Sequence, residues 1–381
     1  MVAALNSNGD MGSLKSARRI VVKIGSALLV DEDTGCVRRD WLDALADDVA
    51  GLRRRGKEVL IVSSGAIAVG RHHLGLDGPI LKLEEKQAAA ATGQIRLAHA
   101  YEEALARHHI TVAQILLSPE DTEGRRRHLN ARATMVTLLE LGAVPVINEN
   151  DTVATAEIRF GDNDRLGARV AQMVSADTLV LLSDIDGLYD SDPRRHLDAR
   201  HIPLVKRITP EIEAMAGTAG TGYASGGMVT KIAAARIASA AGCRMVIVAG
   251  NVSNPLNALE VGARCTWFRA SGSPRGARKN WIASGINPAG TLQLDAGAER
   301  ALGEGRSLLP AGVTLVTGSF ERGDLVTVHG VDGREVARGL IAYNATDAGL
   351  IRGHKSREIE QILGYRGRDE LIHRDDLVLM E

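Results

Sequence analysis

A regular alternation of short apolar runs with helical stretches most constrains how this chain can fold. Buried strands are expected where Val, Ile and Leu cluster, at residues 19–24, 58–63, 111–117, 144–148, 178–183 and 244–249. Helical spacing of apolar residues occurs between these runs, at residues 40–54, 84–108, 130–141, 165–175 and 228–241. Strands that are apolar throughout and alternate with helices are typical of a mostly parallel sheet covered on both faces.

The character of the sequence changes after Phe268. Residues 271–278 are rich in Gly, Ser, Pro and Arg and show little hydrophobic periodicity, as a linker does. Short strands are then expected at residues 312–317, 324–329 and 335–343, with a hairpin signal at Asp332-Gly333. For 381 residues, more than one domain is expected. The predicted parts are a flexible tail at 1–17, an α/β domain at 18–270, a linker at 271–284 and a small β-rich domain at 285–381.

Composition excludes several classes of protein. The 46 basic and 47 acidic side chains nearly cancel, so no strongly basic face for tight nucleic-acid binding is expected. Cys36, Cys243 and Cys265 are odd in number and far apart, which argues against a disulfide framework or a structural zinc site and fits a reducing cytosol. No run approaches the ~20 apolar residues of a membrane helix, and residues 1–17 do not resemble a signal peptide. We therefore predict a cytoplasmic location.

Small and polar residues follow the predicted strands, where ligands collect in open α/β sheets. They are Lys23 with Gly25-Ser26, then residues 63–66, residues 148–151, and Ser183-Asp184. Small residues allow backbone amides to approach phosphate oxygens closely, whereas Asn and Asp suit an ammonium group. The pattern predicts one anionic ligand and one ligand that is partly cationic.

Two lysines indicate where the anion binds. Lys23 ends an apolar strand, and its charge is costly to bury without an anionic partner. Lys231 lies in the first turn of a helix opened by Gly226-Gly227, where unpaired N–H groups disfavour a cation unless an anion such as phosphate is bound. The segment is not a Walker loop, and Gly220 to Ser225 is not a dinucleotide fingerprint because Ser225 replaces the third glycine.

The run Gly161-Asp162-Asn163-Asp164 precedes a predicted helix. Helix capping alone is a sufficient explanation for Asp162 or Asp164. Together with residues 148–151, the run is at least as compatible with an amino-acid pocket. Arg125-Arg126-Arg127 is interpreted as a solvated charge run.

Several motifs resemble those of the glutamate 5-kinase family. They span residues 22–26, 63–68, 146–151, 154–158, 161–164 and 226–231, and residues 307–312 are similar to the PUA domain that ends proteins of that family. The resemblance implies an amino acid kinase αβα sandwich with a C-terminal PUA domain. It also implies the reaction of ATP with L-glutamate to give L-glutamyl 5-phosphate and ADP, the first step of proline biosynthesis.

Site residues follow from the same resemblance. Lys23, Lys231 and Asp184 are implied to be catalytic. ATP is implied to contact Lys23, Gly25, Ser183, Asp184, Ser225, Gly226, Gly227, Met228, Val229, Thr230 and Lys231. Glutamate is implied to contact Ser64, Gly65, Asn148, Asp151 and Asn163. The chain departs from the family pattern at Ser26-Ala27, where Thr-Ser is common, and at Ser183, where Thr is common; both serines keep a hydroxyl group.

The expected mechanism is positioning and charge stabilisation by the two lysines, backbone N–H groups and Mg²⁺ bound with ATP. Asp184 is hypothesised either to orient the lysines or to hold the metal through water, and no direct metal ligand is assigned. Proline as a feedback inhibitor and assembly into dimers or tetramers are implied by the resemblance. Two alternatives stay open: a related kinase acting on N-acetylglutamate, aspartate or carbamate, and an RNA-binding or RNA-modifying protein, since PUA domains are common in such enzymes.

Overall fold

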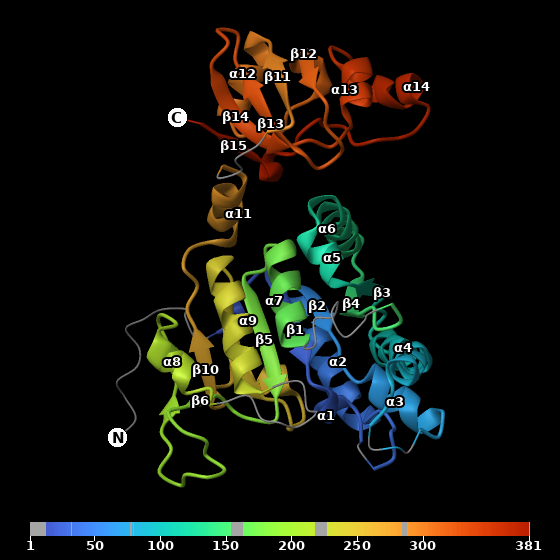
Figure 1. Ribbon diagram of the computed structural model, residues 1–381, viewed down its shortest axis with the longest axis vertical. Helices are drawn as coiled ribbons and strands as arrows, with labels where there is room; N and C mark the ends of the chain where they lie inside the picture. Colours follow the sequence, from blue (N-terminus) through green and yellow to red (C-terminus); the bar gives the residue numbers. More distant parts are fainter. Residues whose placement is uncertain are drawn as a thin grey trace. The chain divides into compact units, whose positions relative to one another are not determined.

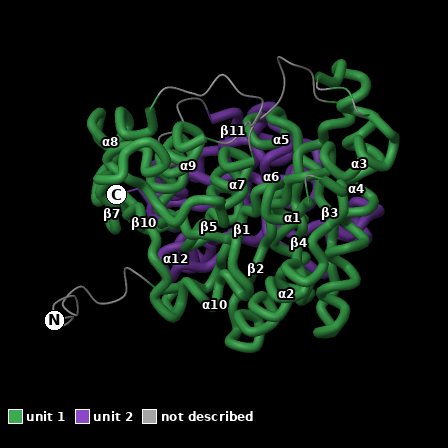
Figure 2. The backbone as a smooth tube through the Cα atoms, turned by 90° about the horizontal axis from the view of Figure 1, so that it is seen from below, with its two compact units in different colours: residues 1–123, 130–274 green, residues 124–129, 275–381 purple. Residues whose placement is uncertain are grey.

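The computed structural model describes residues 13–31, 33–76, 78, 80–153, 163–217, 227–283 and 288–380. The chain divides into two compact units, one of residues 1–123 with 130–274 and one of residues 124–129 with 275–381 (Figure 2). Over the described ranges, no helix combines the length and the apolar character needed to cross a membrane.

An eight-stranded sheet forms the centre of the first unit (Figure 1). In spatial order the strands are β3 (Val112–Leu117), β4 (Val144–Glu149), β2 (Glu58–Val62), β1 (Arg19–Ile24), β5 (Thr178–Ser183), β9 (Arg244–Ala249), β10 (Cys265–Phe268) and β8 (Leu204–Val205). Neighbouring strands are parallel except for β9 and β10, which pair antiparallel. The predicted, mostly parallel sheet is confirmed.

Alternate residues of each central strand enter two separate cores. Ile20, Val22 and Ile24 of β1 pack in a core with helices α2 (Arg39–Arg54), α4 (Leu83–Ala106) and α10 (Pro255–Glu260). Val21 packs on the other face with α7 (Asn163–Met173) and α9 (Met228–Ala240), which cover the strands in Figure 1. Because side chains alternate along a strand, Lys23 must point to the same face as Val21, toward α7 and α9. The layered αβα arrangement is confirmed.

Shorter elements complete the first unit. They are α1 (Ser26–Leu29), α3 (Ala66–His73), α5 (Pro119–Glu123), α8 (Pro210–Ala214), and the pair β6 (Leu188–Tyr189) and β7 (His201–Ile202). The longer helix α6 (Arg125–Glu140) has its first residues in the second unit and the rest in the first. Helices α3 and α4 lie unusually close together at Gly70 and Gly93. A Cβ atom on Gly70 would overlap the carbonyl oxygen of Ala89, and one on Gly93 would overlap that of Ala66.

The second unit is built on a five-stranded sheet. Its strands, in spatial order, are β12 (Val313–Gly318), β11 (Gly290–Leu294), β13 (Leu325–His329), β14 (Glu335–Leu340) and β15 (Leu377–Leu379). Helices α11 (Pro274–Ala283), α12 (Ala296–Gly303), α13 (Ala345–Ile351) and α14 (Ile359–Leu363) accompany it. The sheet fulfils the expectation of a small β-rich region, whereas α11 occupies most of the predicted linker.

Two further segments differ from expectation. Residues 13–17, predicted as part of a flexible tail, are packed: Leu14 is fully buried, and the guanidinium of Arg244 donates to the carbonyl of Ser13. Helix α6 begins at Arg125, five residues earlier than the predicted start at residue 130. Its first turns belong to the second unit, where Leu129 packs against Ile282 and Leu325. The polar run of arginines concealed this helical turn because helical periodicity requires apolar residues.

Candidate active site

Lys23 is held in a nearly dry position at the end of β1. Only 6% of its surface is exposed. Helix α7 can lie against its stem because Gly167 has no side chain: a Cβ atom there would lie 3.3 Å from the Cβ of Lys23. The apolar strand and the glycine together fix where the ammonium group emerges.

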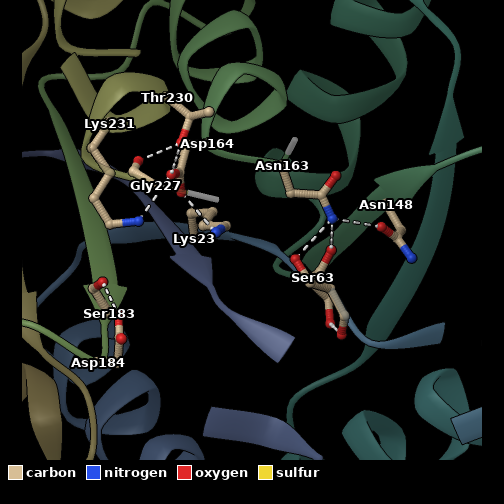
Figure 3. Close-up of polar contacts among 11 residues, drawn as sticks. Lys23, Ser63, Asn148, Asn163, Asp164, Ser183, Asp184, Gly227, Thr230 and Lys231 are labelled. Carbon is tan, nitrogen blue, oxygen red and sulfur yellow. Dashed lines mark hydrogen bonds and ion pairs between the residues drawn. The ribbon is translucent and has the colours of Figure 1, made fainter. Parts of the chain in front are cut away.

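Asp164, in the first turn of α7, binds both lysines that the sequence indicated. Its Oδ1 lies 2.6 Å from the Nζ of Lys23, and its Oδ2 lies 3.1 Å from the Nζ of Lys231 (Figure 3). The hydroxyl of Thr230 also donates to Oδ2, at 3.1 Å. Asp164 is fully buried and Lys231 is only 6% exposed. One carboxylate thus joins the end of β1 to the start of α9.

The charges of this cluster determine what it can bind. Burial by itself raises the pKa of Asp164, but the positive charges of Lys23 and Lys231 outweigh burial and hold that pKa below its usual value. The carboxylate is therefore ionised, and one negative charge faces two positive charges. Because an excess cation in a dry site is unfavourable, the cluster is suited to an anionic ligand. Helix α9 adds to this preference, since its N-cap Gly227 provides no side-chain oxygen for the first N–H groups.

Asp184 has a different set of partners. Its Oδ1 accepts a hydrogen bond from the Ser183 hydroxyl at 3.0 Å, and its Oδ2 lies 2.7 Å from a guanidinium nitrogen of Arg194. Burial by itself raises the pKa of Asp184. The hydrogen bond from Ser183 and the positive charge of Arg194 lower this pKa by more, so the net shift is downward. Among the described residues, Asp164 is the carboxylate that contacts both lysines, whereas Asp184 interacts with Lys231 only through charge. Asp184 keeps a largely exposed carboxylate at the carboxyl end of β5.

Sequence reasoning missed Asp164 because helix capping explained it sufficiently. Asn163 and Asp164 are adjacent, but successive residues in a helix point about 100° apart. The side chain of Asn163 can therefore face the end of β2 while the side chain of Asp164 faces the two lysines. The available signal was the combination of a strand-end lysine with a carboxylate at the start of a helix that covers the same face.

A neutral cluster of amides and hydroxyls lies beside the charged one. The Nδ2 of Asn163 is 2.6 Å from the carbonyl oxygen of Ser63, 2.9 Å from the hydroxyl of Ser64 and 3.0 Å from the Oδ1 of Asn148 (Figure 3). Its two hydrogens are shared among three acceptors. This brings together the ends of β2 and β4 with the start of α7.

Helix α4 and the turn after β2 support this neutral cluster. The Oε1 of Gln94 accepts from the Nδ2 of Asn148 at 2.7 Å, and the hydroxyl of Tyr101 lies 2.9 Å from that of Ser63. Gly65 begins α3 with a φ of 101°, a conformation that a side chain would strain. Neither Gln94 nor Tyr101 could be identified from the sequence, because both lie within an ordinary Ala-rich helix.

The remaining predicted residues are distributed as follows. Gly25 is the N-cap of α1, and Met228 and Val229 open α9. Asp151 lies half-buried in the turn after β4. Ser225, Gly226, Gly161, Asp162 and the motif at 154–158 lie outside the described residues. Within the described ranges there is no group of three or more His, Cys, Asp or Glu side chains arranged to hold a metal ion.

Comparison with known proteins agrees with this architecture. Residues 18–249 match the model of the amino acid kinase family, and residues 290–363 match that of the PUA domain. The fold and the two-lysine site thus define an amino acid kinase with a C-terminal PUA domain. The chain is 66% identical to "Glutamate 5-kinase" of Paramagnetospirillum magneticum (strain ATCC 700264 / AMB-1) over 369 residues, which is 97% of this chain and 100% of that protein.

Other relatives show the same range of similarity. "Glutamate 5-kinase" of Agrobacterium fabrum is 61% identical, covering 96% of this chain and 94% of that protein. "Glutamate 5-kinase" of Gluconobacter oxydans is 60% identical, covering 96% of this chain and 97% of that protein. The chain belongs to the glutamate 5-kinase family of amino acid kinases, and the resemblance drawn from its motifs is confirmed.

Proposed function

We propose that this protein transfers the γ-phosphoryl group of ATP to the side-chain carboxylate of L-glutamate, giving L-glutamyl 5-phosphate and ADP. This reaction is the first step of proline biosynthesis. The observation that carries the proposal is the adjacency of two clusters: Lys23 and Lys231 joined by Asp164, and the neutral amides around Asn163. Asn163 and Asp164 are consecutive, so the anion site and the amide site share one helix start.

Catalysis of this reaction requires no general base. The side-chain carboxylate of glutamate has a pKa of about 4.3 and is already ionised at pH 7. The obstacle is the repulsion between this carboxylate and the phosphates, together with the charge on the phosphoryl group during transfer. Lys23 and Lys231 offset that charge from fixed positions, since Asp164 holds both ammonium groups before the substrates arrive.

The two substrates are assigned to the two clusters. ATP takes the phosphate side, with Lys23, Gly25, Ser183, Asp184 and residues 225–231. Glutamate takes the amide side, with Ser64, Gly65, Asn148, Asp151 and Asn163. The Nδ2 hydrogens of Asn163 are already shared among Ser63, Ser64 and Asn148, so its Oδ1 is the atom that can face the ammonium group of glutamate.

Magnesium fits this arrangement as the partner of ATP. Mg²⁺ in kinases is usually held by one or two carboxylates, water and the substrate phosphates. Asp164 is fully occupied by two lysines, whereas Asp184 keeps an exposed carboxylate. Asp184 would therefore hold the ion, directly or through water. When bound, Mg²⁺ supplies further neutralisation of phosphate charge.

A glutamate-dependent ADP-release assay tests the proposal. L-Glutamate, N-acetyl-L-glutamate, L-aspartate and carbamate are compared with ATP and Mg²⁺, and the acyl phosphate is trapped with hydroxylamine. We expect ADP and hydroxamate with L-glutamate only. Activity on N-acetyl-L-glutamate without activity on L-glutamate would assign the protein to a different substrate.

Regulation and assembly extend the proposal. L-Proline is proposed as a feedback inhibitor acting through the glutamate pocket, and the protein is proposed to form dimers or tetramers. Both rest on the family resemblance and are checked by adding proline to the ADP-release assay and by light scattering. Tight RNA binding through the PUA domain is not expected; sub-micromolar affinity at physiological salt in a filter-binding titration would contradict this.

A further inference from the structure

A chain of side-chain amides crosses from α4 through β4 to α7. Gln94 on α4 accepts from Asn148 at 2.7 Å, and Asn148 accepts from Asn163 at 3.0 Å. Gln94 and Asn148 are both buried, with 9% and 3% of their surfaces exposed. The expected site residues include Asn148 and Asn163 but not Gln94.

Backbone groups fix the direction of every hydrogen bond in this chain. The N–H of Glu149 can only donate, and it lies 2.9 Å from the Oδ1 of Asn148. The carbonyl of Ser63 can only accept, and it lies 2.6 Å from the Nδ2 of Asn163. The oxygen of Asn148 therefore faces Asn163, and its nitrogen faces Gln94; Figure 3 shows this nitrogen turned away from Asn163. Gln94 must in turn present its oxygen to Asn148.

A consequence follows for the other end of Gln94. With Oε1 committed to Asn148, the Nε2 group carries two N–H donors that point elsewhere. Among the described residues, none accepts a hydrogen bond from this nitrogen. This nitrogen is not among the described side-chain atoms that are buried without a partner, so it borders space that solvent can reach. Its two N–H groups are therefore available to an acceptor on a bound ligand.

The sheet order indicates which end of glutamate this acceptor belongs to. The strands run β4, β2, β1, so Asn148 at the end of β4 is two strand spacings, about 10 Å, from Lys23 on β1. The reacting carboxylate must lie at the lysine end, where phosphate binds. Resting on the proposed function, we propose that Gln94 is a glutamate-binding residue: its Nε2 donates to the α-carboxylate while its Oε1 holds Asn148 in place.

Two substitutions separate these two tasks. Gln94→Glu keeps an oxygen for Asn148 but replaces the donor with a carboxylate oxygen facing the substrate carboxylate. Gln94→Met keeps the shape and removes both groups. We expect both variants, assayed at pH 8, to raise KM for L-glutamate by about 10- to 100-fold, the effect of losing a hydrogen bond to a charged group. KM for ATP should stay within about twofold.

Matched controls and a second readout keep the result interpretable. Gln114→Glu makes the same change at an exposed position on β3 and should leave both KM values unchanged. Thermal unfolding of each variant reports whether it folds. If Gln94 only positioned Asn148, Gln94→Glu would retain near-normal KM for glutamate, and that result would overturn the inference.

A substrate analogue tests the same contact without relying on any variant. L-Isoglutamine keeps the side-chain carboxylate but has an amide in place of the α-carboxylate. We expect wild-type KM to be at least tenfold higher for it than for L-glutamate, and this ratio to shrink below about threefold in Gln94→Met. If the wild type had equal KM values for L-isoglutamine and L-glutamate, this inference would be overturned while the proposed function would stand. A wild-type protein that releases no ADP with L-glutamate would instead contradict the proposed function, and this inference with it.

Discussion

The Oδ1 of Asp164 lies 2.6 Å from the Nζ of Lys23, and almost no solvent reaches either side chain. The second oxygen of the same carboxylate reaches Lys231. Two lysines from distant parts of the chain are thereby held at fixed positions by one acid. In the structure, the positions of both ammonium groups are set by their contacts with Asp164.

Replacing Asp164 with asparagine tests this dependence. Asp164→Asn keeps the shape but leaves two buried cations without a negative partner. We expect kcat to fall about 10²- to 10³-fold because the lysines are no longer aligned. Stability should fall by about 3–5 kcal/mol, the usual cost of breaking a buried ion pair. Steady-state kinetics and urea unfolding measure the two effects. The exposed control Asp198→Asn should change neither; unchanged turnover in Asp164→Asn would remove Asp164 from the mechanism.

Each lysine is expected to be needed for turnover. Lys23→Ala and Lys231→Ala should each lower kcat by about 10²- to 10³-fold, the scale for one preorganised donor. In each variant the remaining lysine can still pair with Asp164, so the protein should fold. The ADP-release assay measures the loss, with the exposed Lys206→Ala as control. Near-normal turnover of Lys23→Ala would refute its assignment to phosphate.

Gly167 is expected to be intolerant of even a methyl group. Alanine within a helix usually stabilises by about 1 kcal/mol relative to glycine. At Gly167, however, the new Cβ would lie 3.3 Å from the Cβ of Lys23 and 3.5 Å from the Cδ1 of Leu179. Crowding should prevail, so Gly167→Ala should lower kcat about tenfold and cost about 1–3 kcal/mol of stability.

Gly51 in α2 provides the matched control for that substitution. A Cβ atom there meets only the end of the Arg54 side chain, at 3.8 Å. Gly51→Ala should therefore be as stable as the wild type or more stable, with unchanged kcat. If Gly167→Ala and Gly51→Ala changed kcat and stability by the same amount, Lys23 would not depend on the close approach of α7.

The stability contributed by Asp164 should depend on pH in a defined direction. Its folded-state pKa is below the unfolded value of 3.8, because the two lysines outweigh the effect of burial. Its contribution is therefore present above pH 3.8 and lost as the pH falls through the lower folded-state value. Urea unfolding of the wild type and Asp164→Asn from pH 7 to pH 3 should show their stability difference shrinking below pH 3.8. A stability difference that stays constant down to pH 3 would show that the Asp164 carboxylate is not stabilised by the two lysines.

The sequence predicted the central sheet well because its strands are apolar throughout. The limits of β1, β5 and β9 match the structure at both ends, and both lysines were found from their unfavourable surroundings. It did not identify Asp164, whose position at a helix start has a simpler explanation in capping. Gln94 was equally hidden, because a polar residue in a long helix is ordinary until its tertiary neighbour is known. The start of α6 was missed for lack of apolar residues.

The close contact of α3 with α4 has a consequence for how this protein can vary in evolution. At Gly70 and Gly93 any side chain would overlap a backbone carbonyl of the facing helix, and backbone cannot move aside as a flexible side chain can. Gln94 directly follows Gly93, so separating the helices would also displace the amide chain that reaches Asn163. Lineages that keep this pocket are therefore expected to keep both glycines, while lineages that lose one should also drift at position 94.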